Sequence, residues 1–186
     1  MKAPVRKRPA PRLLAAAIVC VLAIAACGGS SGITPAAYVR SMCTALGNWK
    51  TDVQTAGSKL QASGAQSASR PVAKRDYQTF VAALVTATRR TASALHAAGE
   101  PSVSDGKRIA EGLARAFDQA TSKLTHAESQ AGKISTASPS AFQLGASAVT
   151  AEIKSALQGI ASVAPSQSAA LRSAAAKDPA CRVLRG

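Results

Sequence analysis

The stretch SPSAFQLGASAVTAEIKSALQGIASV, residues 138–163, decides the fold class of this chain. Its apolar residues return at alternating intervals of four and three, which is the heptad spacing of a helix that buries one face. They are Phe142, Ala146, Val149, Ile153, Ala156, Ile160 and Val163. Ser138 and Pro139 form a typical helix start, and Pro165 ends the pattern. The stretch therefore predicts an amphipathic helix that packs against other helices.

A helix of the same kind is predicted close to residue 34. Thr34 can cap its first turn, Pro35 suits the first helical position, and an apolar stripe continues to about Gln61. The stripe consists of Tyr38, Met42, Leu46, Trp49, Val53, Ala56 and Leu60. The sequence ASGAQSAS, residues 62–69, then breaks the pattern.

Two more helices are predicted between these segments. The second starts near Ser69 and Pro71 and stops at residues 99–101, and the third starts near residues 104–106, where Asp105 or Ser104 can cap the first turn. The second helix carries Tyr77, Phe80, Val81, Leu84, Val85, Thr88 and Leu95 on its apolar face. The third helix carries Ile109, Leu113, Ala116, Phe117, Ala120, Leu124, Ala127, Ala131 and Ile134.

The whole pattern predicts an all-α fold. Alanine, the strongest helix former, dominates the chain, and runs of β-branched residues are absent. Four long helices joined by short connections pack most simply as an antiparallel, up-down-up-down four-helix bundle. A short helix over about residues 166–176 follows the bundle. We expect the bundle domain to cover residues 34–186.

The N-terminal region resembles a bacterial lipoprotein signal peptide. Five basic residues precede a 14-residue apolar run, residues 13–26, which would reach only about 21 Å as a helix and cannot span a bilayer core of roughly 30 Å. Ile24-Ala25-Ala26-Cys27 is similar to the lipobox, in which the cysteine receives a diacylglyceryl thioether before cleavage. Cys20 follows Val19, which is not the small residue that cleavage requires.

This resemblance implies a signal peptide over residues 1–26, lipidation at Cys27, and a flexible tether over residues 27–33. The alternative is an ordinary signal peptide followed by a structural cysteine. Under the lipobox reading, the protein is exported and held at the outer face of the cell membrane.

The charge of the chain is strongly basic. Five of its 23 basic residues precede residue 13, which leaves 18 against nine acidic residues and a net charge of +9 after cleavage. This charge favours anionic envelope surfaces such as lipid headgroups or wall polymers, although basic residues that only solvate helix faces explain it as well. A nucleic-acid partner is not expected, because the few aromatic residues are widely scattered and form no stacking array.

Cys43 and Cys181 remain after Cys27 is assigned to the lipid. Two further cysteines in an exported chain predict one disulfide, because the environment is oxidising. In an antiparallel bundle of four helices, the first helix starts at the same end of the bundle where the last helix stops, so Cys43 and Cys181 can meet. The alternative, a free catalytic thiol, has no histidine nearby in the sequence to support it.

Motifs that carry chemistry are few. His96 and His126 have no partners at metal-ligand spacing except the weak His96/Glu100 spacing across a helix end. A metal site needs more ligands than that, so no metal site and no cofactor are expected. No nucleophile elbow or phosphate-binding loop occurs, and no Ser-x-x-Lys box of the penicillin-binding type is placed with its partner motifs. We therefore predict no enzyme. A catalytic site would need charged groups that the linear sequence cannot bring together, such as Arg89 or Arg90 with Asp76 or Glu111.

Four aromatic residues, Tyr38, Trp49, Tyr77 and Phe80, could line a ligand pocket between the helices, but aromatics on such stripes are more often plain core.

The chain as a whole resembles the small secreted lipoproteins of high-GC actinobacteria, a group of helical lipoproteins with no established activity. The resemblance is carried by Ile24–Cys27, by Tyr38-Val39-x-x-Met42-Cys43 leading to Trp49, by Pro101-x-Val103-x-Asp105-Gly106, and by Pro179-Ala180-Cys181-x-Val183-Leu184. The resemblance implies the helical fold, the location, and the roles of Cys27 and of the Cys43/Cys181 pair. The anchor, the tether and the lack of a catalytic constellation favour a lipid-anchored, non-catalytic interaction or structural module whose partner is an unknown protein or envelope polymer. The alternative is a carrier or sensor that binds a small apolar or anionic molecule between the helices.

Overall fold

The computed structural model describes residues 32–64, 69–163 and 168–185, so the predicted signal peptide, Cys27 and Pro165 lie outside the described residues. The described residues form four long helices, a short one and a terminal 3₁₀ helix. These elements are α1 (Pro35–Gly64), α2 (Arg70–Ala97), α3 (Gly106–Gly132), α4 (Pro139–Ala161), α5 (Ala169–Lys177) and η1 (Pro179–Leu184).

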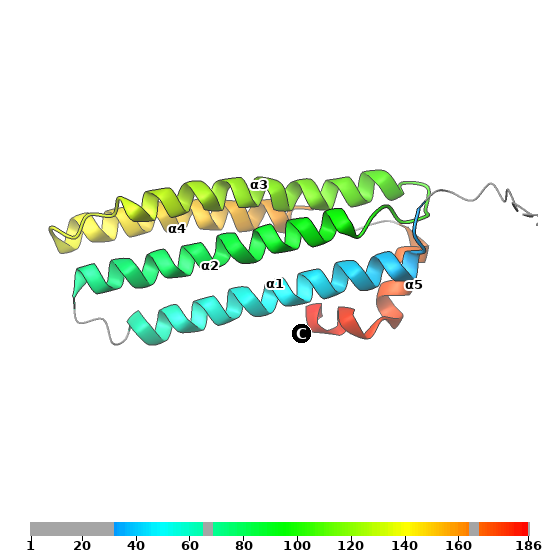
Figure 1. Ribbon diagram of the computed structural model, residues 1–186, viewed down its shortest axis with the longest axis horizontal. Helices are drawn as coiled ribbons and strands as arrows, with labels where there is room; N and C mark the ends of the chain where they lie inside the picture. Colours follow the sequence, from blue (N-terminus) through cyan, green and yellow to red (C-terminus); the bar gives the residue numbers. More distant parts are fainter. Residues whose placement is uncertain (1–31, 65–68, 164–167, 186) are drawn as a thin grey trace, which may run out of the picture.

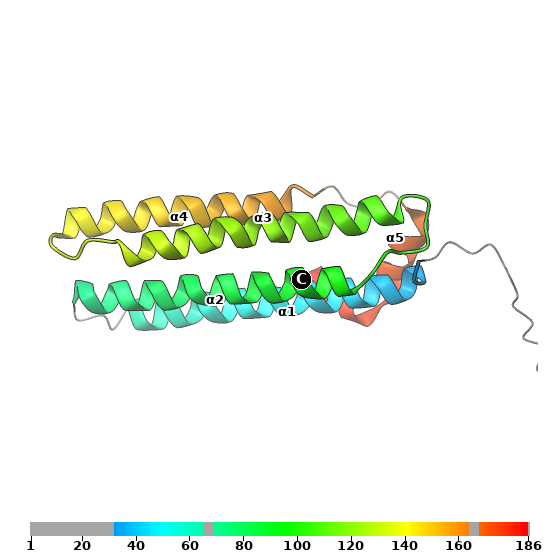
Figure 2. The same ribbon diagram turned by 45° about the horizontal axis from the view of Figure 1, so that its top comes forward.

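The four long helices lie side by side, and each runs antiparallel to the one before it (Figure 1). Close packing joins α1 to α2, α2 to α3, and α3 to α4, whereas the backbones of α1 and α4 make no comparably close approach among the described residues. Figure 2 shows the α3 and α4 pair above the α1 and α2 pair. The predicted antiparallel helical bundle is confirmed.

We call the end where α1 starts, where α2 connects to α3 and where α5 lies the proximal end (right in Figure 1), and the opposite end the distal end. At the distal end, the Arg70 guanidinium at the start of α2 donates to the carbonyl oxygens of Thr136 and Ala137. This contact joins the start of α2 to the connection between α3 and α4.

The core consists of three apolar clusters that follow one another along the bundle. The distal cluster contains Val81, Leu84, Leu124 and Val149, with Ala127 and Ala131 between them. The middle cluster surrounds Phe117, which is fully buried, and the proximal cluster joins α1, the start of α3, α5 and η1. Many of these core residues are alanines, which let helix backbones approach closely.

Helix starts follow the predicted caps with one exception. The Thr34 and Ser138 hydroxyls accept hydrogen bonds from the backbone N–H groups of Ala37 and Ala141, both at 3.2 Å. The exception is Asp105, which precedes α3 but accepts no capping bond, because its carboxylate pairs instead with Arg108 at 2.8 Å.

The ends of α3 and α4 differ from the predicted helices. Ile134 was expected on α3 and Val163 on α4, but the helices end at Gly132 and Ala161. The last turn of α3 tightens, with Lys133 N–H donating to Gln130 and Ile134 N–H to Ala131. Ile134 is nevertheless only 2% exposed, because it closes the core between α3 and α4 from the connection. The terminal 3₁₀ helix was not predicted.

The caps give a matched test of local stability. Ser138→Ala is expected to lower the free energy of unfolding by about 1 kcal/mol, because the hydroxyl that satisfies Ala141 N–H is lost. Ser69 occupies the same position before α2 but makes no capping bond, so Ser69→Ala should change stability by less than about 0.5 kcal/mol. Urea unfolding of both variants measures the difference. Equal losses would contradict the assigned cap.

Candidate functional site

The chain joins the bundle at Ile33 through two backbone hydrogen bonds. Ile33 N–H donates to the Glu100 carbonyl oxygen and Ser102 N–H donates to the Ile33 carbonyl oxygen, both at 2.8 Å. We call this contact the Ile33 bridge; it is a parallel bridge to Pro101 in the connection between α2 and α3. The bridge fixes Ile33 against the connection between α2 and α3 at the proximal end.

The connection that receives Ile33 is tightly built. A Cβ atom on Gly106 would lie 1.8 Å from the Pro101 carbonyl oxygen, and one on Gly32 would lie 2.5 Å from the Glu100 carbonyl oxygen. Gly99 has a positive φ of 74°, which side chains rarely tolerate. Glycine is therefore required at each of these places, and the proximal end has one defined backbone path.

The C-terminal segment is tied to α1 near the same end. Cys43 and Cys181 form a disulfide, as predicted. Arg40 Nε donates to the Asp178 carboxylate at 3.2 Å, and Lys50 Nζ donates to the Val183 carbonyl oxygen at 2.9 Å. Asp178 is buried although it is charged, and its other oxygen accepts from Ala180 N–H. These contacts hold η1 along the flank of α1.

The four aromatic residues considered as ligand-lining do not converge. Tyr38 lies in the proximal cluster, Trp49 packs in the middle cluster, and Tyr77 and Phe80 pack against the distal cluster. Trp49 meets Phe117 edge to face at 5.5 Å between ring centroids and donates its indole N–H to Thr88. The four aromatic side chains are therefore distributed along the whole core and do not form one site.

The surroundings of Tyr38 and Tyr77 raise the pKa of both phenol groups. Burial raises the pKa of the Tyr38 phenol. Burial also raises the pKa of Tyr77, and the hydrogen bond between its hydroxyl and Thr150 at 2.7 Å partly offsets that rise. The Tyr77 hydroxyl contacts the Ala146 carbonyl oxygen as well, at 3.3 Å, so it joins α2 to α4.

Two of the four charged residues considered for catalysis pair with other side chains. Arg90 pairs with Asp52 of α1 at 3.1 Å, and Glu111 pairs along its own helix with Lys107 and Arg115. Among the residues that the structure describes, neither Arg89 nor Arg90 forms an ion pair with Asp76 or Glu111. These are surface ion pairs, which typically contribute little to stability.

Both histidines form pairs that the sequence did not indicate. His96 of α2 contacts the Asp118 carboxylate of α3 at 2.9 Å, and His126 of α3 contacts the Glu152 carboxylate of α4. His126 also meets the Gln130 amide on its other ring nitrogen. The partners lie on neighbouring helices, so no spacing within one helix could have revealed them. Among the described residues, no three His, Cys, Asp or Glu side chains gather where they could hold a metal ion.

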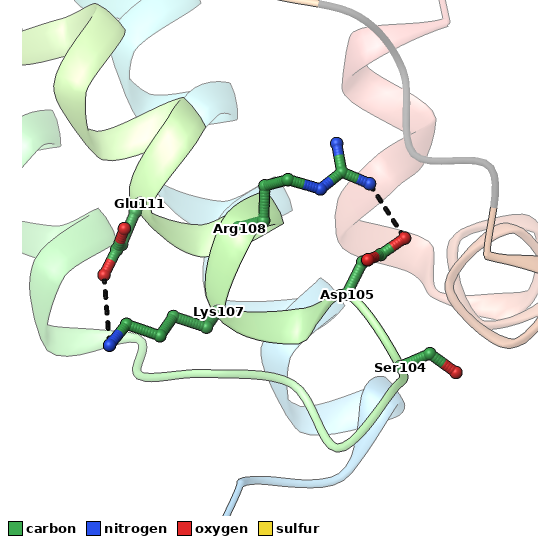
Figure 3. Close-up of a pocket in the computed structure, with 5 residues that line it drawn as sticks. All are labelled: Ser104, Asp105, Lys107, Arg108 and Glu111. Atoms are coloured by element: carbon green, nitrogen blue, oxygen red, sulfur yellow. Dashed lines mark hydrogen bonds and ion pairs between the residues drawn. The ribbon is translucent and has the colours of Figure 1, made fainter.

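A polar depression of about 310 Å³ lies at the start of α3, lined by Ser104, Asp105, Lys107, Arg108 and Glu111 (Figure 3). Two ion pairs occupy it: Arg108 with Asp105, and Lys107 with Glu111 at 3.8 Å. Ser104 lies apart from both pairs on the preceding loop. The charges of the depression thus compensate each other.

An apolar groove of about 370 Å³ lies on α4. Two neighbouring rows of that helix line it, an apolar row of Ile153, Leu157 and Ala161 and a polar row of Thr150, Lys154 and Gln158. Sequence reasoning missed this groove, because only Ile153 of its lining belongs to the predicted apolar stripe.

Neither depression is lined by Tyr38, Trp49, Tyr77 or Phe80. Tyr77 touches the groove only through its hydrogen bond to Thr150.

No helix within the described residues is long and apolar enough to cross a membrane. Comparisons of this chain with protein families, with curated proteins and with solved structures found no match.

Proposed function

We propose that this protein is an exported lipoprotein, anchored at the outer face of the cell membrane through a diacylglyceryl group on Cys27, whose bundle serves as a non-catalytic interaction or structural module. The partner is a protein or an envelope polymer. The residues that carry the anchor are those of the lipobox-like Ile24–Cys27 sequence.

The Ile33 bridge is the observation that supports this proposal most directly. Cys27 precedes Gly32 by five residues, so at about 3.4 Å per residue an anchored cysteine lies within about 17 Å of the proximal end. Because Ile33 is hydrogen-bonded to the connection between α2 and α3, the tether leaves from a fixed point at that end. The proximal end would then face the membrane.

The length of the bundle sets how far the distal end would stand from the membrane surface. The 30 residues of α1 span about 45 Å at 1.5 Å per residue. An upright bundle would therefore carry its distal connections about that far beyond the lipid surface, where a partner in the envelope can meet them. Arg90 is held in a surface ion pair with Asp52, and Glu111 in a surface ion pair with Arg115, which is consistent with a non-catalytic role. The carrier alternative gains nothing from the four aromatics, since they lie in three separate clusters.

Cys27→Ala is expected to abolish lipid attachment and to leave an uncleaved precursor. The sulfur of Cys27 is the atom that the thioether requires, and cleavage follows lipidation. Metabolic labelling with an alkyne fatty acid in a bacterial host, with and without globomycin, measures both steps. Cys20→Ala is the matched control and should be labelled and cleaved like the natural chain. Processing that resists globomycin and carries no lipid label would overturn the anchor.

A further inference from the structure

We propose that the anchored bundle lies on its side on an anionic membrane, with one basic layer of the fold against the lipid headgroups. The basic layer consists of α1, α2, α5 and η1, residues 34–64, 69–97 and 168–185. This orientation rests on the proposed function, because the lipid on Cys27 is what brings the chain to the membrane.

The net charge of the described residues lies entirely in the basic layer. That layer holds 12 basic and three acidic residues, a net charge of +9. Residues 98–163, which contain α3 and α4, hold six basic and six acidic residues, and we call them the neutral layer. Figure 2 shows the α1 and α2 pair on one side of the α3 and α4 pair, and α5 and η1 pack on α1. The fold therefore separates the charge of the chain into one charged and one neutral layer.

Ion pairing also differs between the two layers. At the start of α3, Lys107 and Arg115 both pair with Glu111. Arg108 pairs with Asp105. In the basic layer, by contrast, six exposed cations make no side-chain hydrogen bond or ion pair with any residue that the structure describes. They are Lys59, Arg75, Arg89, Lys177, Arg182 and Arg185.

The six cations are spread along the length of the basic layer. Lys59 and Arg75 lie toward the distal end, whereas Arg182 and Arg185 lie with η1 along the proximal part of α1 (Figure 1). They do not converge as the polar groups of a small-molecule site do. A plane of anionic headgroups attracts each cation that comes within a Debye length, about 8 Å. The distribution therefore fits an extended anionic surface.

The side of the bundle brings more of this charge to the lipids than its end does. Lys59 and Arg75 each lie more than about 30 Å from the proximal ends of their helices, so an upright bundle would hold both far beyond the Debye length. An anchor on Cys27, within about 17 Å of Gly32, does not prevent the tilt, because that span exceeds the diameter of a helix, about 10 Å. Anionic headgroups therefore favour the lying orientation.

One apolar side chain among the cations favours a lipid surface over a soluble polymer. Val183 is 53% exposed and stands between Arg182 and Arg185, and the hydrogen bond from Lys50 to its carbonyl oxygen holds it on α1. At a bilayer interface, an apolar side chain can enter the acyl boundary while the neighbouring cations bind headgroups. A phosphate polymer in solution would use the charges alone.

The test uses the mature lipoprotein, purified from a bacterial host and reconstituted in vesicles. Thr79→Cys on α2 and Ser147→Cys on α4 are both exposed positions, nine and eight residues from the distal starts of their helices, so they compare the two layers at one height. With Cys27 lipidated and Cys43 bridged to Cys181, each variant carries one free thiol for a fluorophore. A nitroxide on the lipid headgroup quenches a fluorophore that lies close to it.

We expect the Thr79 label to be quenched about threefold more strongly than the Ser147 label in vesicles that contain phosphatidylglycerol. The difference should vanish in phosphatidylcholine alone, and also at about 1 M salt, where the Debye length falls to about 3 Å. Equal quenching of the two labels on anionic vesicles at low salt, or stronger quenching at Ser147, would overturn the lying orientation.

Matched variants separate the basic layer from net charge. Arg182→Gln combined with Arg185→Gln should lower the difference between the labels about twofold, because two unpaired cations leave the contact. Lys133→Gln combined with Lys154→Gln removes the same charge from exposed positions of the neutral layer and should leave the difference unchanged. Equal losses in the two double variants would show that net charge alone attracts the chain, and would overturn the basic layer as the contact.

Val183→Ser separates the lipid surface from a wall polymer. It should weaken quenching of the Thr79 label, because an apolar group leaves the interface. An unchanged signal in Val183→Ser, together with loss of the difference when soluble polyglycerol phosphate is added, would assign the basic layer to a polymer instead.

The intact mass of the purified chain separates this orientation from the anchor. A chain that carries the diacylglyceryl mass but shows equal quenching of both labels overturns the orientation and leaves the anchor in place. A chain without that mass overturns the anchor, and the anchored orientation with it.

Discussion

Removal of the Cys43–Cys181 disulfide is expected to lower the free energy of unfolding by about 5 kcal/mol. The bridge joins residues 138 positions apart, and the chain-entropy model gives about this value for a loop of that length. Cys43→Ala, Cys181→Ala and the double variant should each show the same loss, because either substitution breaks the same bond. Guanidinium unfolding, monitored by circular dichroism, measures it.

Reduction of the natural chain provides the control. A reducing agent should destabilise the natural protein by the same amount and should have no effect on the double variant. Losses of the two single variants that add up in the double variant would show that the cysteines act as separate packing groups. A loss below about 1 kcal/mol would mean that the remaining contacts of η1, such as Lys50 with the Val183 carbonyl, already hold the C-terminal segment in place.

Gly106→Ala has the second largest expected effect, a loss of about 3 kcal/mol in the free energy of unfolding. The new Cβ atom would lie 1.8 Å from the Pro101 carbonyl oxygen, so the connection between α2 and α3 must move. That movement would also disturb the Ile33 bridge, which uses the same connection. We expect faster hydrogen exchange at Ile33 and Ser102 together with the lower stability.

Gly112→Ala is the matched control on the same helix. A Cβ atom at Gly112 would meet nothing within 4 Å, and alanine is the better helix former. This variant should therefore be more stable than the natural chain by about 1 kcal/mol. If both variants were stabilised alike, α3 would not begin in close contact with Pro101, and the path of the chain at the proximal end would be different.

Local sequence signals predicted most helix boundaries to within a few residues. Thr34 with Pro35 and Ser138 with Pro139 start helices at those positions. Such signals work because a capping bond and a helical hydrogen bond join residues that are three or four apart. Ile134 shows their limit, since its apolar spacing continued the pattern of α3 after the helix had ended, and its burial comes from packing in the connection to α4.

The candidate sites depended on contacts between helices, which sequence spacing does not contain. Tyr77 illustrates this, because its apolar position was correct but its hydroxyl partner, Thr150, lies on another helix. Asp105 or Ser104 was expected to cap α3. Asp105 instead pairs with Arg108, because the guanidinium three residues further along the chain competes with the backbone amides for the carboxylate. The rotation of each helix about its axis decides such pairings.

The sequence by itself determined that this chain forms antiparallel helices with a buried apolar stripe and that Cys43 can meet Cys181. Those properties follow from helical periodicity, alanine content and the order of the elements along the chain. Only the tertiary structure decided where the aromatics lie along the core and which carboxylate each histidine meets. The physical reason is that four amphipathic helices bury similar apolar area in several rotations and offsets, and close contacts such as Gly106 on Pro101 select one arrangement.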